Sequence, residues 1–204
     1  MSGPARFVVL KGGDASGKTT QVDRLAARLR EQGIDVVATF EPGATALGAR
    51  LRRLLLDGDH PVDPVAEALM MAADRAEHVA EVLRPALARG EWVVSDRYVP
   101  SSLAYQGVGR ELGVVEIERL NALATAGIEP DLVVVLDLAP EAARRRLGAE
   151  RDRLEDEGDA FALAVHGAYH DLAKSRGWVL VDANRTPDEV AEDVWSVVWD
   201  RLSP

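Results

Sequence analysis

The feature that most restricts the fold is a glycine-rich segment set between an apolar run and a helical pattern. Residues 12–19 read GGDASGKT and fit the phosphate-loop pattern G-x-x-x-x-G-K-[ST]. The apolar run RFVVL at 6–10 comes before it, and a helical pattern at 18–32 follows it. Such a loop needs a buried strand, a turn of inward-facing backbone N–H groups and a helix N-terminus in succession. The chain is therefore expected to contain a strand–loop–helix unit that binds phosphate.

The rest of the chain repeats the alternation of apolar strands and helices. Valine-rich runs predict strands at 6–10, 35–40, 91–95, 131–138 and 177–182. Helical patterns are found at 18–32, 48–58, 62–89, 114–126, 140–147, 157–175 and 187–202. Pro85 is expected to bend or divide the longest of them. The alternation indicates a single α/β domain over residues 1–204, with a parallel sheet covered by helices on both faces.

Polar residues follow the predicted strands at the carboxyl ends, where sheets of this kind bind ligands. EPGAT follows the second strand, and SDRYVPSSLAYQG begins at the end of the third. Asp96 is a candidate support for Mg²⁺ together with Thr19 of the phosphate loop, and Arg97 is a candidate two-pronged phosphate ligand. The charged segment at 148–158 is either an ordinary solvated loop or a lid that brings arginines over a phosphate.

Composition narrows the classes of partner. A formal net charge of -10 would repel a long polyanion such as DNA, while a small anionic ligand needs only a local cluster of positive groups. The chain has no cysteine, which excludes disulfides, thiolate metal sites and cysteine nucleophiles. The N-terminus is too short for a signal peptide, and no apolar run approaches the length of a membrane span. We expect a cytoplasmic protein without nucleic-acid or membrane partners.

Lysine and histidine are scarce, and their positions are informative. Two of the three lysines, Lys11 and Lys18, lie at the phosphate loop, and Lys18 occupies the motif position that reaches the terminal phosphates. The four histidines, at 60, 78, 166 and 170, are interpreted as surface or helix-packing residues without catalytic-triad or metal-ligand spacing.

Several segments taken together resemble the bacterial thymidylate kinases. The phosphate loop, EPGAT, AADRAEH, SDRYVPSSLAYQG, EPDLVVVLD and DRLE occur in the order and spacing of that family, between residues 6 and 198. The resemblance implies a phosphate-loop nucleoside-monophosphate-kinase fold, with a five-stranded parallel sheet flanked by helices and a short lid at about 148–156. It also implies phosphorylation of dTMP to dTDP with ATP and Mg²⁺, in a homodimer.

The resemblance assigns roles to individual residues of this chain. The residues implied to bind ATP are Gly12, Gly13, Asp14, Ala15, Ser16, Gly17, Lys18, Thr19 and Thr20, with Arg151 and Arg153 from the lid. The residues implied to bind dTMP are Glu41, Pro42, Arg52, Met71, Arg75, Arg97, Ser102, Tyr105 and Gln106. Thr19 and Asp96 are the implied metal-site residues, and Lys18, Arg97, Arg153 and Asp14 the catalytic ones.

The chain departs from the family pattern at three positions. Lys11 replaces a usual glutamate, Met71 a usual aromatic residue, and Phe40 an arginine that many bacterial members carry. We interpret Lys11 as a residue that tunes or impairs the acceptor site and not as a second catalytic lysine, so Lys11→Glu is expected to preserve or raise activity. Two other functions stay open: a related kinase with a different acceptor, and a protein that binds nucleotide without turnover.

Overall fold

The core of the protein is one five-stranded parallel sheet. The structure, a computed structural model, describes residues 4–57, 61–146 and 157–203. The strands are β1 (Phe7–Gly12), β2 (Val36–Phe40), β3 (Trp92–Asp96), β4 (Leu132–Asp137) and β5 (Val179–Asp182). Their order in the sheet is β2-β3-β1-β4-β5, and every pairing is parallel. The expected five-stranded parallel sheet is confirmed.

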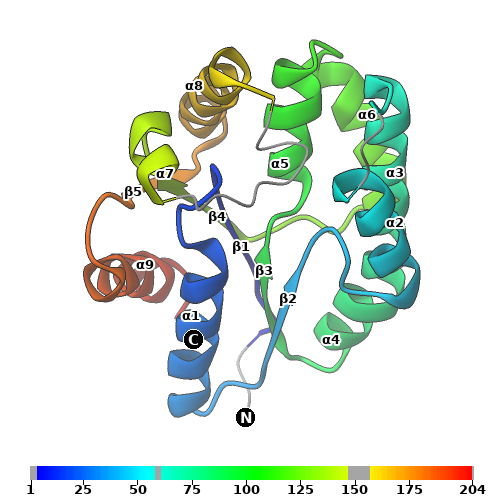
Figure 1. The fold of residues 1–204 in the computed structure, drawn as a ribbon. Coiled ribbons are helices and arrows are strands. Elements are labelled where there is room, and N and C mark those ends of the chain that lie inside the picture. Colours follow the sequence, from blue (N-terminus) through cyan, green and yellow to red (C-terminus); the bar gives the residue numbers. More distant parts are fainter. Residues whose placement is uncertain (1–3, 58–60, 147–156, 204) are drawn as a thin grey trace.

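Helices cover both faces of this sheet, as Figure 1 shows. They are α1 (Lys18–Glu31), α2 (Ala46–Leu56), α3 (Pro64–His78), α4 (Arg84–Ala88), α5 (Val99–Ser102), α6 (Val114–Thr125), α7 (Pro140–Arg146), α8 (Asp159–Arg176) and α9 (Pro187–Leu202). Two π-helical turns, η1 (Val79–Leu83) and η2 (Leu103–Gly109), continue α3 and α5. In Figure 1, α1 and α9 lie on one side of the sheet, and α2, α3, α4 and α6 lie on the other.

Alternation along β1 explains the two faces. Val8 and Leu10 belong to the hydrophobic cluster that contains residues of α1 and α9, whereas Phe7 and Val9 belong to the cluster with α3, α6 and α8. Lys11 continues the second series, so its side chain points toward α8 and not toward α1. The alternation of side chains along β1 thus decides on which face of the sheet the Lys11 side chain lies.

The predicted helix at 62–89 is divided, as expected. It consists of α3, η1 and α4, and the π-helical turn directly precedes the segment that contains Pro85. Proline has no N–H to donate to a carbonyl one turn earlier, so a wider turn at this point is physically reasonable. By contrast, α5 and η2 lie where no helix was predicted.

The strand ends bring the candidate residues to one edge. Asp96 of β3 lies opposite Leu10 of β1 and Phe40 of β2, and Asp137 of β4 lies opposite Asp182 of β5. The phosphate loop follows the central strand, β1, at the same edge. The strand order changes direction there, because β3 lies on one side of β1 and β4 on the other. In the part of the chain that the structure describes, no helix combines the length and apolar character needed to cross a membrane. The predicted lid at about 148–156 lies outside the described residues.

Candidate active site

The phosphate loop is packed closely against the neighbouring strand. A Cβ on Gly12 would lie 2.5 Å from the backbone oxygen of Leu136 and 2.6 Å from Ser16 Oγ, so this position requires glycine. Lys18 Nζ donates to the carbonyl of Gly13 at 2.7 Å, and Gly17 at the start of α1 has φ of +85°. The first turn of α1 contains no acidic residue. The loop therefore offers backbone N–H groups and a lysine to an anion.

A buried carboxylate lies beside this loop. The Thr19 hydroxyl donates to Asp96 Oδ2 at 2.7 Å. The other oxygen, Oδ1, is buried and has no hydrogen-bond partner among the described residues. A buried oxygen left in this way is costly unless a cation or water satisfies it. A hydroxyl and a carboxylate oxygen suit the hard ion Mg²⁺, so Thr19 and Asp96 fit the metal role that the resemblance implies.

The structure gathers all the residues predicted to bind dTMP around one pocket. The lining consists of Glu41, Pro42, Arg52, Met71, Arg75, Arg97, Ser102, Tyr105 and Gln106, together with Asp14, Leu56 and Ser101. We call it the acceptor pocket. Asp14 belongs to the phosphate loop, so the pocket and the loop share a residue. Sequence reasoning missed Leu56 and Ser101, although Leu56 lies one helical turn after Arg52 and Ser101 is next to Ser102.

Arg97, Asp14 and Tyr105 form the contact between the acceptor pocket and the phosphate loop. Arg97 Nη2 lies 2.6 Å from Asp14 Oδ1, and the Tyr105 hydroxyl donates to Asp14 Oδ2 at 3.2 Å. Burial acts to raise the pKa of Asp14, but the charges of Arg97 and Lys18 and the two hydrogen bonds lower it overall. Asp14 is therefore ionised. Arg97 directly follows β3 and has a left-handed backbone with φ of +73°, a conformation that residues other than glycine rarely adopt.

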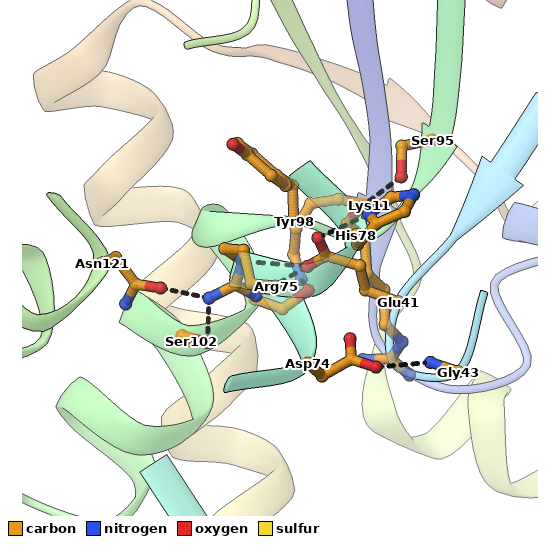
Figure 2. A network of polar contacts seen from close by, with 12 residues as sticks. Lys11, Glu41, Gly43, Asp74, Arg75, His78, Ser95, Tyr98, Ser102 and Asn121 are labelled. Carbon is orange, nitrogen blue, oxygen red and sulfur yellow. Dashed lines mark hydrogen bonds and ion pairs between the residues drawn. The ribbon is translucent and has the colours of Figure 1, made fainter. Parts of the chain in front are cut away.

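A second ion-pair network, centred on Glu41, forms the wall of the acceptor pocket (Figure 2). Nε and Nη2 of Arg75 both lie 2.9 Å from Glu41 Oε2, and Arg75 Nη1 donates to Ser102 Oγ and Asn121 Oδ1. His78 Nδ1 lies 2.8 Å from Glu41 Oε1. All of these side chains are almost fully buried. Protein groups thus hold Arg75 rigidly in the acceptor pocket. The family resemblance implies that Arg75 contacts the thymine base there.

The Asp74 carboxylate faces the other side of this network. It accepts a hydrogen bond from the N–H of Gly43 at 2.9 Å, as Figure 2 shows. Burial, followed by the negative charge of Glu41, raises its pKa from 3.8 to about 6.

Lys11 is buried next to the acceptor pocket. Its Nζ donates to Ser101 Oγ at 3.1 Å and to the Tyr169 hydroxyl, and it lies 3.8 Å from the centre of the Tyr169 ring. Burial, followed by the charges of Arg97 and Lys18, lowers the pKa of Lys11 well below its usual value. Lys11 therefore contacts Ser101 of the acceptor pocket without lining the pocket itself, and its role stays a prediction.

A further pocket lies between the phosphate loop, α7 and α8. Gly13, Asp14, Leu138, Arg144, Phe161 and His166 are among its lining residues. Arg146, the last residue of α7, donates from Nη2 to the carbonyl of Ala183, in the loop that follows β5. The lid residues Arg151 and Arg153 lie outside the described residues.

Two of the histidines form a cluster that the interpretation from the sequence did not include, and His60 lies outside the described residues. His78 packs in the Glu41 network, as a helix-packing residue should. His166 and His170, however, meet Asp137 in an arrangement that could hold a metal ion. Their spacing of four residues on a helix was the signal in the sequence, since such residues share one helix face.

Comparison with known proteins agrees with these features. The family model described as thymidylate kinase matches residues 10–194. A thymidylate kinase of Synechococcus sp. (strain JA-3-3Ab) is 51% identical over 200 residues, covering 96% of each chain. Another, from Synechococcus sp. (strain JA-2-3B'a(2-13)), is 50% identical and covers 96% of this chain and 95% of the relative. One from Leifsonia xyli subsp. xyli is 47% identical, with coverage of 94% and 93%. The expected resemblance is confirmed: the chain belongs to the thymidylate kinase family.

Proposed function

We propose that this protein transfers the γ-phosphoryl group of ATP to dTMP and so forms dTDP and ADP, a step that supplies dTTP synthesis. Membership of the thymidylate kinase family supports this reaction. The observation that carries the residue roles is the acceptor pocket, because every residue implied to bind dTMP lines it and it shares Asp14 with the phosphate loop.

On the donor side, the phosphate loop binds the ATP phosphates through its backbone N–H groups and Lys18. Thr19 and Asp96 would hold Mg²⁺, which when bound neutralises charge on the phosphates. Arg151 and Arg153 are assigned to the lid, where they would supply positive charge to the transferring group. Residues 12–20 form the donor site in this assignment.

On the acceptor side, Arg52 and Arg97 bind the dTMP phosphate. Arg75, Ser102 and Gln106 face the base, Met71 covers its ring and Tyr105 packs against the deoxyribose. A phosphate oxygen of dTMP is already nucleophilic near pH 7, so it attacks the γ-phosphorus directly and ADP leaves. The side chains contribute position and charge neutralisation, and no protein group has to accept a proton.

The proposal also covers the oligomeric state of the protein and its location in the cell. We assign the protein to the cytoplasm as a homodimer, in line with the family resemblance and the absence of cysteine. Exposed hydrophobic residues on α3, Val65 and Leu69, are compatible with a helix-mediated interface.

A coupled ADP-release assay over dTMP, dUMP, dCMP, dGMP and dAMP tests the reaction. We expect the highest kcat/KM for dTMP and loss of turnover in Lys18→Ala, with Lys174→Ala as the matched control. Preference for another nucleotide would establish a kinase with a shifted acceptor. Calorimetric binding of ATP and dTMP without formation of dTDP would establish a nucleotide-binding protein.

A further inference from the structure

Three side chains of metal-ligating type meet between the end of β4 and α8. Asp137 is the last residue of β4, and His166 and His170 lie one turn apart on α8. Nε2 of His166 lies 2.9 Å from Asp137 Oδ1, and Nε2 of His170 lies 3.0 Å from the same oxygen. The two ring centroids are 4.8 Å apart. Two imidazoles from one helix face therefore converge on one carboxylate from the sheet.

The spacing of the donor atoms suits a small ion. The nitrogen and oxygen ligand atoms all lie within 4.8 Å of one another. Zinc–ligand bonds of about 2.0–2.2 Å place the ligands of a tetrahedral ion roughly 3.3 Å apart. The oxygen-to-nitrogen separations are only a few tenths of an ångström shorter than this, so a small opening of the side chains would admit the ion.

The site is open to solvent but attached to rigid elements. The side chains of Asp137, His166 and His170 are 31%, 29% and 41% exposed. An ion can therefore enter from solvent, and water can complete its coordination. The ligands themselves are carried by a sheet strand and a helix, so their backbone positions are fixed before binding.

Phosphoryl transfer gives no role to the cluster of Asp137, His166 and His170. The proposed phosphoryl transfer assigns no role to either imidazole, and the Mg²⁺ position belongs to Thr19 and Asp96. Two nitrogen donors and one carboxylate also differ from the all-oxygen ligands that Mg²⁺ prefers. Imidazole donors favour Zn²⁺, Co²⁺, Ni²⁺ or Cu²⁺.

We propose that Asp137, His166 and His170 form a binding site for a divalent transition metal, with Zn²⁺ as the representative ion. The ion joins β4 to α8. The same helix contributes Tyr169 to the Lys11 contact and Phe161 to the ring packing of Tyr105. Metal binding therefore ties to β4 a helix that contacts Lys11, directly before the phosphate loop, and Tyr105, which lines the acceptor pocket.

Calorimetric titration of untagged, chelator-stripped protein tests the site without reference to catalysis. Zn²⁺ and Co²⁺ are titrated separately, without nucleotide and with excess Mg²⁺ present throughout. We expect one equivalent of metal per chain, a thermal midpoint that rises with metal concentration, and visible absorption from bound Co²⁺. Because outer-sphere changes alone cost 10–100-fold in affinity, His170→Gln should weaken binding by at least about tenfold.

The matched control is Asp171→Asn, which changes an exposed acid next to a proposed ligand and should leave metal affinity unchanged. The double variant His166→Gln/His170→Gln should lose the Co²⁺ absorption. If that variant does not fold, Asp137→Asn and His170→Gln each have to weaken binding for the proposal to stand. Absence of binding to the parent protein, affinity unchanged in these variants, or displacement of Zn²⁺ by Mg²⁺ would each overturn it. None of these results depends on the acceptor assay.

Discussion

The two faces of the sheet bury different kinds of side chain. The face covered by α1 and α9, here the apolar face, packs residues such as Val8, Leu29 and Val198. The opposite face, here the charged face, also buries Glu41 and Arg75, in addition to its hydrophobic residues. The acceptor pocket opens on the charged face. Charges that shape the pocket are therefore part of the core there, whereas the apolar face contributes to stability through hydrophobic packing.

The largest effect should come from breaking the buried ion pair of the charged face. Arg75→Ala removes the arginine that pairs with Glu41. The Glu41 carboxylate then stays buried without that positive charge. Removal of one partner from a buried pair costs about 3–5 kcal/mol. Urea unfolding should show this loss, and Arg84→Ala, at an exposed arginine further along the same helical segment, should not. A loss below about 1 kcal/mol would mean that the network does not stabilise the charged face.

A cavity in the apolar face should have a comparable or smaller effect that is insensitive to pH. Leu29 of α1 is fully buried in the apolar cluster. Leu29→Ala should lower the free energy of unfolding by about 2–5 kcal/mol. The loss should be the same near pH 5 and pH 8, and Glu31→Ala at an exposed position of α1 should change stability by less than about 0.5 kcal/mol. A strong pH dependence of the Leu29→Ala loss would contradict the distinction between the faces.

The charged face should make the stability of the protein depend on pH, through the carboxyl group of Asp74. The pKa of Asp74 is raised to about 6 on folding, so the protonated form favours the folded state. Its contribution is complete at low pH and is lost as the pH rises through about 6. Asp74→Asn cannot ionise and keeps an oxygen acceptor for the Gly43 N–H. It should therefore stabilise the protein by about 1–2 kcal/mol near pH 8.

The same substitution should have little effect near pH 4, where the parent carboxyl is already protonated in the folded state. Chemical unfolding at both pH values measures the difference, with Asp23→Asn at an exposed position of α1 as the control. Equal effects of Asp74→Asn at the two pH values would show that ionisation of this group does not limit stability.

The smallest effect is expected at Lys11. Lys11→Glu places a carboxylate where the Ser101 and Tyr169 hydroxyls can donate to it and where Arg97 is a nearby positive charge. We expect kcat/KM for dTMP equal to or above that of the parent, measured beside Lys174→Glu as a control. A drop of more than about tenfold would show that Lys11 is needed in its present form.

Local patterns predicted most of the fold. The helix at 187–202 has the expected bounds because its apolar period and its Thr186 capping box act within the segment. The helical segment after β3 was missed, because Pro100 and neighbouring small residues carry only a weak local helix signal.

The candidate site was predicted less completely, and its residue roles stay predictions. The resemblance to the thymidylate kinases implied which residues would gather at the acceptor pocket. It could not indicate that Glu41 and Arg75 pair in the core, nor that Asp137 meets two histidines of α8. These contacts join residues far apart in the sequence, and the topology of the sheet decides them.

The contact between Arg97 and Asp14 has a consequence for selectivity among anions. The guanidinium of Arg97 has a carboxylate partner 2.6 Å away, so its positive charge is compensated within the protein. An incoming anion has to compete with that partner, and it gains only the difference between the two interactions. A chloride ion or another weak monovalent anion gains little from this exchange. Under the proposed function, a dianionic phosphate monoester that is also held by its base gains more, so Asp14 would favour the nucleotide over small anions.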